Sequence, residues 1–111
     1  MDILESDRQI IYDTLKYYAD LPYPYEDVKT EVIVSGDRRH YLLISWGWEP
    51  TRRLHGCIGH IEVIGDKIWI YQDGTEDGLA PDLVTAGIPK NRIVLAFQPP
   101  EVRPHTEYAA G

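Results

Sequence analysis

The chain has 111 residues, of which 43% are hydrophobic and 26% charged, and its formal net charge is −7. This length suits one domain with a single core, residues 1–111, and this composition is typical of a folded protein. The negative charge excludes a protein whose main task is to neutralise nucleic-acid phosphates. Because no apolar run reaches the roughly 20 residues of a membrane-spanning helix, and because acidic residues stand where a signal peptide needs basic ones, we expect a soluble cytoplasmic protein.

The first predicted element is an amphipathic helix from Asp2 to Asp20. Its apolar residues recur at nearly helical spacing, as in a helix that rests one face on a core: Leu4, Ile11, Leu15 and Tyr18. Two prolines in the segment Leu21–Tyr25 end the helix, because proline lacks an amide hydrogen and disfavours helical geometry in the residue before it. An extended linker on the surface should follow.

Residues 28–72 have the composition and alternation of β-strands. Turns are indicated at Gly36–Arg39 and at the two-residue hairpin signal Gly65-Asp66, and Glu49-Pro50-Thr51 interrupts the pattern between them. The predicted strands are residues 28–35, 40–48, 53–64 and 67–72. Strands in this meander order form an antiparallel sheet.

A polar loop and a short second helix, Leu79–Ala86, follow the sheet. Thr75 or Asp77 could cap the start of this helix, and Gly87 stands where a glycine commonly ends one. The apolar run Ile93–Phe97 predicts a short buried strand, and three later prolines predict an irregular tail. The predicted fold class is α+β: an antiparallel sheet of four or more strands with both helices packed on one face.

The stretch RRLHGCIGH concentrates chemically reactive side chains. His55, Cys57 and His60 are residue types that hold zinc or form a Cys/His nucleophile. A closed zinc shell would need a further ligand, such as His40, His105 or a carboxylate. A small metal-dependent enzyme at these residues is therefore one hypothesis. A single cysteine forms no internal disulfide, which suits a reducing compartment.

The hairpin turn at Gly65-Asp66 gives a test of this site, because it sets the register of the strands on either side. It pairs Val63 with Ile68, Glu62 with Trp69, Ile61 with Ile70, and His60 with Tyr71. Counting back by twos from the apolar face places Cys57 and His55 on the core side and His60 on the other side. We therefore expect Cys57 to be a buried, unreactive side chain, unless a bulge at Gly56 or Gly59 changes the register.

The face opposite the core is expected to carry aromatic side chains outward. Glu62, Trp69 and Tyr71 belong to this set and are candidate residues for binding a protein partner. The chain has three tryptophans and eight tyrosines, a surplus for one small core, which is compatible with a homodimer.

Charge is distributed unevenly along the chain. The first 27 residues contain seven acidic and two basic residues, whereas four arginines stand near the middle: Arg38, Arg39, Arg52 and Arg53. These arginines are candidates for contact with phosphate or with an acidic partner. A second hypothesis is therefore direct DNA binding, with the sheet aromatics stacking on unpaired bases.

Several blocks of sequence together form a pattern that is more specific than any single motif. They are WGWEPTRRLHGCIGHI, KIWIYQDGTEDGL and LVTAGIPKNRIVL, with RQII in the first predicted helix and FQPP and TEYA towards the end. In their order and spacing, over essentially the whole chain, these blocks resemble the XisI family. Its members are small cyanobacterial proteins named as controlling factors for excision of the fdxN element.

The resemblance implies an accessory role in site-specific DNA rearrangement, in which a separate recombinase cuts and rejoins the DNA. It implies an XisH-like protein as partner, since the two are commonly encoded side by side. It brings no catalytic residue, metal or cofactor to this chain. The leading hypothesis is therefore a non-enzymatic regulatory factor that binds an XisH-like protein and so controls DNA recombination, with nucleic acid contacted only indirectly or weakly.

Overall fold

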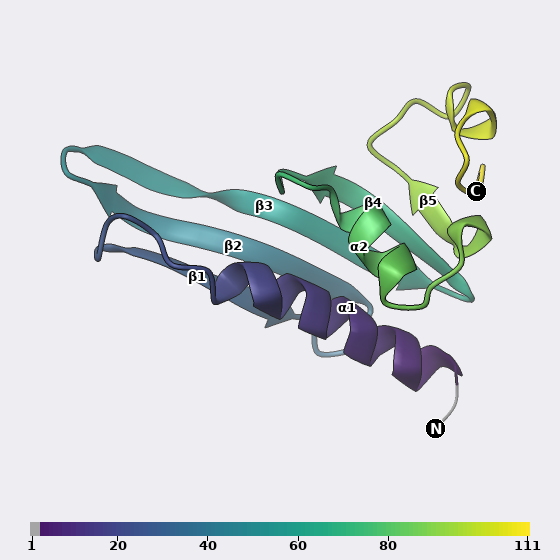
Figure 1. Cartoon of the computed structure of the whole chain (residues 1–111), viewed down its shortest axis with the longest axis horizontal. Coiled ribbons are helices and arrows are strands. Elements are labelled where there is room, and N and C mark those ends of the chain that lie inside the picture. Colours follow the sequence, from purple (N-terminus) through teal and green to yellow (C-terminus); the bar gives the residue numbers. More distant parts are fainter. Residues whose placement is uncertain (1–2) are drawn as a thin grey trace.

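The computed structural model describes residues 3–111 and contains one sheet with two helices on one of its faces (Figure 1). Its strands lie in the order β1-β2-β3-β4-β5, antiparallel except for β5, which runs parallel to β4. The elements are α1 (Ile3–Ala19), β1 (Val28–Val34), β2 (His40–Glu49), β3 (Arg52–Ile64), β4 (Lys67–Asp73), α2 (Leu79–Thr85), η1 (Lys90–Arg92), β5 (Ile93–Leu95) and η2 (Arg103–His105). The α+β prediction is confirmed, and only the predicted start of the first helix at Asp2 lies outside the described residues.

The core lies between the two helices and the sheet. From α1, Ile11 and Leu15 are fully buried, and from α2, Leu79 and Leu83 are fully buried. They pack on sheet residues that are equally buried: Leu43, Ile61, Ile68 and Ile70. Burying one such side chain stabilises the fold by about 1.5–3 kcal/mol. The apolar stripe predicted for the first helix is therefore the stripe that builds the core.

Polar contacts near both ends of α1 fix this helix against its neighbours. Asp7 on α1 is 4% exposed and receives both terminal nitrogens of the Arg92 guanidinium. This hydrogen bonding raises the pKa of Arg92. The Tyr18 hydroxyl donates to the Asp82 carboxylate on α2. Each end of α1 is thus held by a bond to a distant part of the chain.

The ends of α2 agree only in part with the sequence prediction. Thr75 and Asp77, the predicted caps, do not cap the helix; instead, Asp73 Oδ2 accepts the Leu79 N–H at 2.7 Å. Asp73 is held in this position because its other carboxylate oxygen accepts the N–H and the hydroxyl of Thr75, at 3.1 and 2.7 Å. At the other end, Gly87 has φ 119° and closes the helix in the predicted way, since its N–H binds the Val84 carbonyl and the next amide binds the Leu83 carbonyl.

One part of the sheet projects beyond the helices. β4 pairs with β3 only over Gly59–Ile64, so residues 52–57 of β3 have β2 as their single neighbouring strand. We call residues 46–57 the arm and the helix-covered remainder the body; the arm forms the pointed end of the sheet in Figure 1. The predicted linker, residues 21–25, is exposed and lies on the helix side of the arm.

The linker is fixed to the arm by the residues that follow it. Trp48 N–H donates to the Asp27 carbonyl at 3.2 Å, and Val28 pairs with Gly47 in the ladder. A Cβ atom on Gly47 would lie 1.8 Å from the Asp27 carbonyl oxygen, and the φ of this glycine is +138°. Only glycine fits this close approach without a shift of the backbone.

The register of β3 corrects the prediction for its reactive residues. Next to the hairpin turn, Val63, Glu62 and Ile61 pair as predicted, but His60 pairs with Gln72 and not with Tyr71, because Tyr71 is an extra, bulged residue. A second irregularity occurs where β3 pairs with β2, because Leu43 pairs with Gly59 while the next residue of β2 pairs with Cys57. Ile58 is therefore unpaired. This unpaired residue places every earlier residue of β3 on the face opposite to the one predicted.

The C-terminal residues fold back over one end of the outer sheet face, the face away from both helices. β5 ends at Leu95, two residues earlier than predicted, and Val94 forms an isolated bridge with Ala109. The guanidinium of Arg103 lies 5.4 Å from the ring centre of Trp69, and Lys67 Nζ donates to the Gly111 carbonyl at 2.8 Å. Among the described helices, none has the length and apolar character needed to cross a bilayer.

Candidate functional site

The middle of the outer face carries an apolar strip that neither helix covers. Along β2, Tyr41, Leu43 and Ser45 point into the core and are buried, so the intervening residues Leu42, Ile44 and Trp46 point outward. Trp48 at the end of β2 is 51% exposed, and Ile33 on β1 is 45% exposed. Exposed apolar side chains on one face of a sheet are typical of a protein-binding surface.

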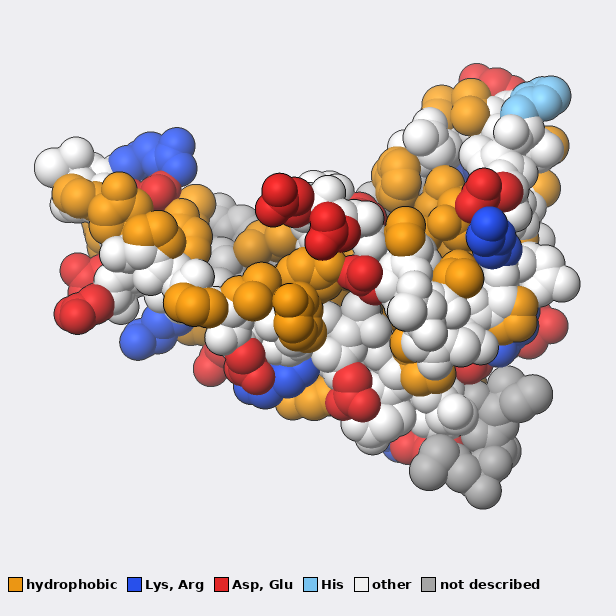
Figure 2. Space-filling model, viewed as in Figure 1, with side chains coloured by type: hydrophobic (Ala, Val, Ile, Leu, Met, Phe, Trp, Pro, Cys, Tyr) orange, Lys and Arg blue, Asp and Glu red, His pale blue; other side chains and the backbone are white. Residues whose placement is uncertain are grey.

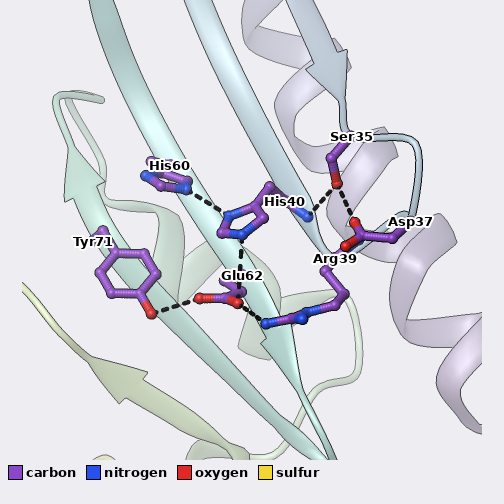
Figure 3. Close-up of polar contacts among 7 residues, drawn as sticks. All are labelled: Ser35, Asp37, Arg39, His40, His60, Glu62 and Tyr71. Atoms are coloured by element: carbon purple, nitrogen blue, oxygen red, sulfur yellow. Dashed lines mark hydrogen bonds and ion pairs between the residues drawn. The ribbon is translucent and has the colours of Figure 1, made fainter.

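A polar network of five side chains, here the Glu62 network, borders this strip. Its members come from the turn before β2 and from three adjacent strands: Arg39, His40, His60, Glu62 and Tyr71 (Figure 3). Glu62 is 7% exposed and receives the Tyr71 hydroxyl at 2.7 Å and the Arg39 guanidinium at 2.5 Å. His40 Nε2 lies 3.4 Å from the same carboxylate. A buried carboxylate is tolerated only where it has such partners.

The two histidines of the network face each other across β2 and β3. His40 Nδ1 and His60 Nε2 are 3.0 Å apart, which requires one nitrogen to donate and the other to accept. Of these two facing nitrogens, one therefore carries a hydrogen and the other does not. The His60 ring also packs on Tyr71, with ring centres 5.0 Å apart.

The ionisation of the network follows from these contacts. The hydrogen bond from Tyr71 lowers the pKa of Glu62, and the bond from Arg39 lowers it further, although burial acts in the opposite direction. Desolvation lowers the pKa of His60, and the neighbouring His40 adds to this effect, while Glu62 opposes it. Near neutral pH the network thus holds a carboxylate and a neutral His60.

Arg39 reaches Glu62 because the preceding turn is held by its own side chains. The Ser35 hydroxyl donates to Asp37 at 2.6 Å and accepts the His40 N–H at 3.0 Å. The same carboxylate oxygen of Asp37 accepts the Arg39 N–H at 3.0 Å, and Arg38 adopts a left-handed φ of 60°. This arrangement turns Arg38 and Arg39 to different sides.

His55, Cys57 and His60 do not form the zinc site or the Cys/His nucleophile considered from the sequence. The bulge at Ile58 places Cys57 opposite Ile44 and His55 opposite Trp46, so both lie on the outer face with His60. The prediction that Cys57 is buried is wrong: this residue is exposed, and its thiol lies 3.1 Å from the Gly59 carbonyl oxygen. Desolvation raises the pKa of the thiol, which disfavours the nucleophilic thiolate. Within residues 3–111, no three His, Cys, Asp or Glu side chains are grouped so that they could share a metal ion.

The four candidate arginines are divided between two distant turns. Arg38 and Arg39 precede β2 and Arg52 and Arg53 follow it, so a ten-residue strand of roughly 30 Å separates the pairs. Arg38 binds Glu5 at 2.5 Å, Arg39 binds Glu62, and Arg52 binds Glu49. They do not form one basic surface.

Comparison with known proteins assigns the chain to a family. The family model for XisI protein matches residues 1–110. The chain belongs to the XisI family. A crystal structure of a XisI-like protein from Anabaena variabilis ATCC 29413 has 30% sequence identity and a TM-score of 0.89, with 97% of this chain and 99% of that chain covered. The fdxN element excision controlling factor XisI from the same organism has 32% identity and a TM-score of 0.82, with 99% and 100% covered. A search of curated proteins finds no match.

In this XisI-family chain, the three predicted partner-binding residues do lie on the outer face, but in different environments. Glu62 is enclosed by its network, whereas Trp69 is half-buried beneath the tail. Tyr71 is half-buried between the two, with its ring stacked on Trp69 at 6.5 Å. Their role in binding stays a prediction.

Sequence reasoning missed the Glu62 network as a unit. The sequence pattern indicates His40 only as a further metal ligand, and Arg39 only as a contact for phosphate or an acidic partner. The signal that could have found the network is the hairpin alignment itself, because it places Glu62 and Trp69 opposite each other on the face that His60 shares. The pairing of β2 with β3, which adds His40 and Arg39, begins at the two-residue turn Pro50-Thr51, but the bulge at Ile58 shifts the register between that turn and the network.

Proposed function

We propose that this XisI-family chain is a non-enzymatic accessory factor that controls excision of a DNA element by binding an XisH-like protein. The exposed apolar strip on the outer face carries this proposal. Apolar side chains in this position gain stability when a partner removes them from water, at about 25 cal/mol for each Å² buried. The family relation adds that a 32% identical protein is named an excision controlling factor.

The surroundings of the strip favour a protein partner over a nucleic acid. The chain has a net charge of −7, and three of the four candidate arginines already have acidic partners. A nucleic acid would require several uncompensated positive charges on one surface. The rim of the strip is instead formed by the Glu62 network, with Trp69 and Tyr71 towards the tail. Polar and aromatic groups around an apolar centre are common at protein interfaces.

The test is co-purification of this chain with an XisH-like protein from the same organism. We expect a complex at micromolar concentration and a loss of affinity of at least tenfold in the double variant Ile33→Ser/Trp48→Ser. Both side chains are largely exposed, at 45% and 51%, so their replacement should leave the fold intact. Phe97→Ser is the matched control, because Phe97 is 46% exposed but lies in the tail.

Three outcomes separate the parts of the proposal. If the wild-type chain forms no complex at micromolar concentration, the proposed function is wrong. If Phe97→Ser weakens the complex as much as the double variant does, the strip is not the binding surface. If the free chain is a dimer that the double variant converts to a monomer, a second copy covers the strip. Light scattering coupled to size exclusion distinguishes this last case.

A further inference from the structure

The arm leaves one edge of β3 without a strand beside it. Pairing with β4 begins at Gly59, and the bond from Gly74 N–H to the Ile58 carbonyl, at 2.7 Å, is the last backbone contact along that edge. Over residues 52–57, every second residue of β3 therefore directs its N–H and C=O away from β2. Five of these six residues are exposed. Such an edge can accept a further strand through backbone hydrogen bonds.

Little on this edge prevents a strand from approaching. Edges are commonly protected by proline, lysine or an inward-pointing charge, and residues 52–57 contain none of these apart from the two arginines at the turn. Gly56 lies at the middle of the edge, and a Cβ atom placed on it would have no atom within 4 Å. Ile58 ends the free edge with its bulge. The open segment is therefore about six residues long, the length of an ordinary strand.

A cleft of about 540 Å³ lies on the helix side of this edge. Tyr17, Tyr18 and Tyr23 line it from α1 and the linker, while Glu76 and Asp77 line it from the loop after β4. In Figure 2 acidic side chains lie beside hydrophobic ones near the middle of this face, where the loop after β4 is seen in Figure 1. Aromatic faces together with carboxylates bind a guanidinium or an ammonium group.

The charge of the cleft is not neutralised by the chain itself. Among residues 3–111, neither Glu76 nor Asp77 has an ion-pair partner, and both are exposed. Asp82 lies close by, in an adjoining hollow of about 310 Å³ that Asp77 also lines. The free edge and the cleft are thus next to each other, and the cleft has an unbalanced negative charge.

A third hollow, of about 330 Å³, adjoins the edge directly and is mainly apolar. Leu54, Ile58 and Tyr23 line it, and it shares Ile58 and Tyr23 with the cleft. Alternate side chains of an added strand lie on one side of the sheet, about 7 Å apart. One such side chain would enter the apolar hollow, and the next on that side would reach the cleft.

We infer that the arm edge, residues 52–57, binds an extended segment of a protein partner as an additional strand, with an apolar side chain in the Leu54 hollow and an arginine or lysine in the tyrosine-lined cleft. The segment would occupy the space in line with β4. The backbone of β3 would supply most of the affinity, and Glu76 and Asp77 would select the basic residue. The inference rests on the proposed function only for the identity of the partner.

The first experiment measures amide hydrogen exchange of the wild-type chain, alone and with the XisH-like protein. We expect binding to slow exchange at residues 52–57. The double variant Glu76→Lys/Asp77→Lys should weaken the complex at least tenfold, while Glu101→Lys, an exposed charge reversal in the tail, should stay within twofold. A complex that forms without protection at 52–57, or without an effect of the double variant, would overturn the inference and leave the proposed function standing.

A second experiment does not depend on that partner. It compares two labelled peptides of eight residues by fluorescence anisotropy. In both, every second residue is threonine; the residues between them, which share one side of the strand, alternate between valine and arginine in one peptide and between valine and glutamate in the other. We expect the arginine peptide to bind more tightly by at least tenfold, and to lose this preference with Glu76→Lys/Asp77→Lys but not with Glu101→Lys. Equal binding of both peptides, or none, would contradict the inference. Slower exchange of the amides that point away from β2 when the free chain is concentrated would also contradict it, by showing that a second copy occupies the edge.

Discussion

The two halves of β3 have the same backbone conformation in different environments. From Gly59 to Val63 the strand lies between β2 and β4 beneath the helices, and four of its five residues are buried. From Arg52 to Cys57 it has one neighbouring strand, and five of six residues are exposed. A single bulged residue, Ile58, separates them. The contrast shows that stability comes from the body, while the surface left open to other molecules is on the arm and the outer face.

The arm is held by contacts of a different kind from those of the body. Its two strand segments, from β2 and β3, pair with each other, and the Trp48 N–H bonds to the carbonyl of Asp27, which follows the linker. Arm residues contribute little to the buried core. Substitutions in the arm should therefore change binding more than folding, and substitutions in the body should do the reverse. Five predictions follow, beginning with the largest effect.

Leu15→Ala should destabilise the chain most. Leu15 is fully buried between α1 and the sheet, so the substitution removes buried methyl groups and leaves a cavity, at a cost of about 3 kcal/mol. Leu54→Ala is the arm counterpart, and because Leu54 is only half-buried it should cost less than about 1 kcal/mol. Urea unfolding followed by tryptophan fluorescence measures both. Equal losses would show that the arm is part of the folding core.

Gly47→Ala should have the next largest effect, at the point where linker and arm meet. The added methyl group would collide with the Asp27 carbonyl and force the backbone out of its left-handed φ, at a cost of about 2 kcal/mol. We expect faster amide exchange at Trp48, whose N–H loses its acceptor, with little change at Ile61. Gly36→Ala is the control, because a Cβ there meets nothing within 4 Å. Unchanged exchange at Trp48 would show that the linker does not hold the arm.

Glu62→Gln should remove part of the pH dependence of stability. The folded pKa of Glu62 is lowered below 4.5, so its ionised form stabilises the fold above that pH, and the contribution is lost as the pH falls through the folded pKa. We expect the variant to be less stable than wild type by about 1–2 kcal/mol at pH 7, the cost of weakening hydrogen bonds to a charged group. The difference should shrink in acid. A constant difference from pH 7 to pH 3 would contradict the lowered pKa.

His60→Gln should also reduce the loss of stability in acid, but in a higher pH range than Glu62→Gln. The folded pKa of His60 is lowered below 6.5, so the unfolded chain takes up more protons as the pH falls below that value, and the fold loses stability. The variant His60→Gln should therefore show a flatter stability profile between pH 7 and pH 5 than the wild type. His105→Gln, an exposed residue of the tail, is the matched control for this slope.

Arg52→Ala should have the smallest effect. The side chain is 73% exposed and its ion pair with Glu49 is at the tip of the arm, where water and salt screen it. We expect a change in the urea midpoint no larger than the error of the measurement, both in low salt and in 0.5 M NaCl. A clear loss that disappears in high salt would show that this pair holds the turn of the arm.

Much of the body could be predicted from sequence because its signals are local. The stripe of Ile11 and Leu15 follows helical spacing, and the two-residue turn after Ile64 fixes the pairing of Val63, Glu62 and Ile61. Gly87 ends α2 in a left-handed conformation, as its position in the sequence indicates. In each case one short stretch determines both the conformation and the face that is buried.

The candidate site could not be predicted in the same way, because its geometry depends on irregular residues and distant pairs. The glycines of β3 only indicate that a bulge can occur near Ile58, and nothing in the sequence marks Tyr71 as bulged. The bulge at Ile58 moves Cys57 to the outer face, and the one at Tyr71 changes the partner of His60. Asp73 caps α2 from six residues away, and the residues nearest the helix do not. A periodic pattern records which residues alternate, and it does not record where the alternation is interrupted.

The bulge at Ile58 also has a consequence for the divergence of related chains. Deleting this one residue would restore strict alternation, leave the register from Gly59 to Ile64 untouched, and exchange the two sides of residues 52–57. His55 and Cys57 would then point towards the linker, and Leu54 and Gly56 away from it. Deletion of a single residue would thus change the side chains exposed on each face of the arm and leave the core unchanged.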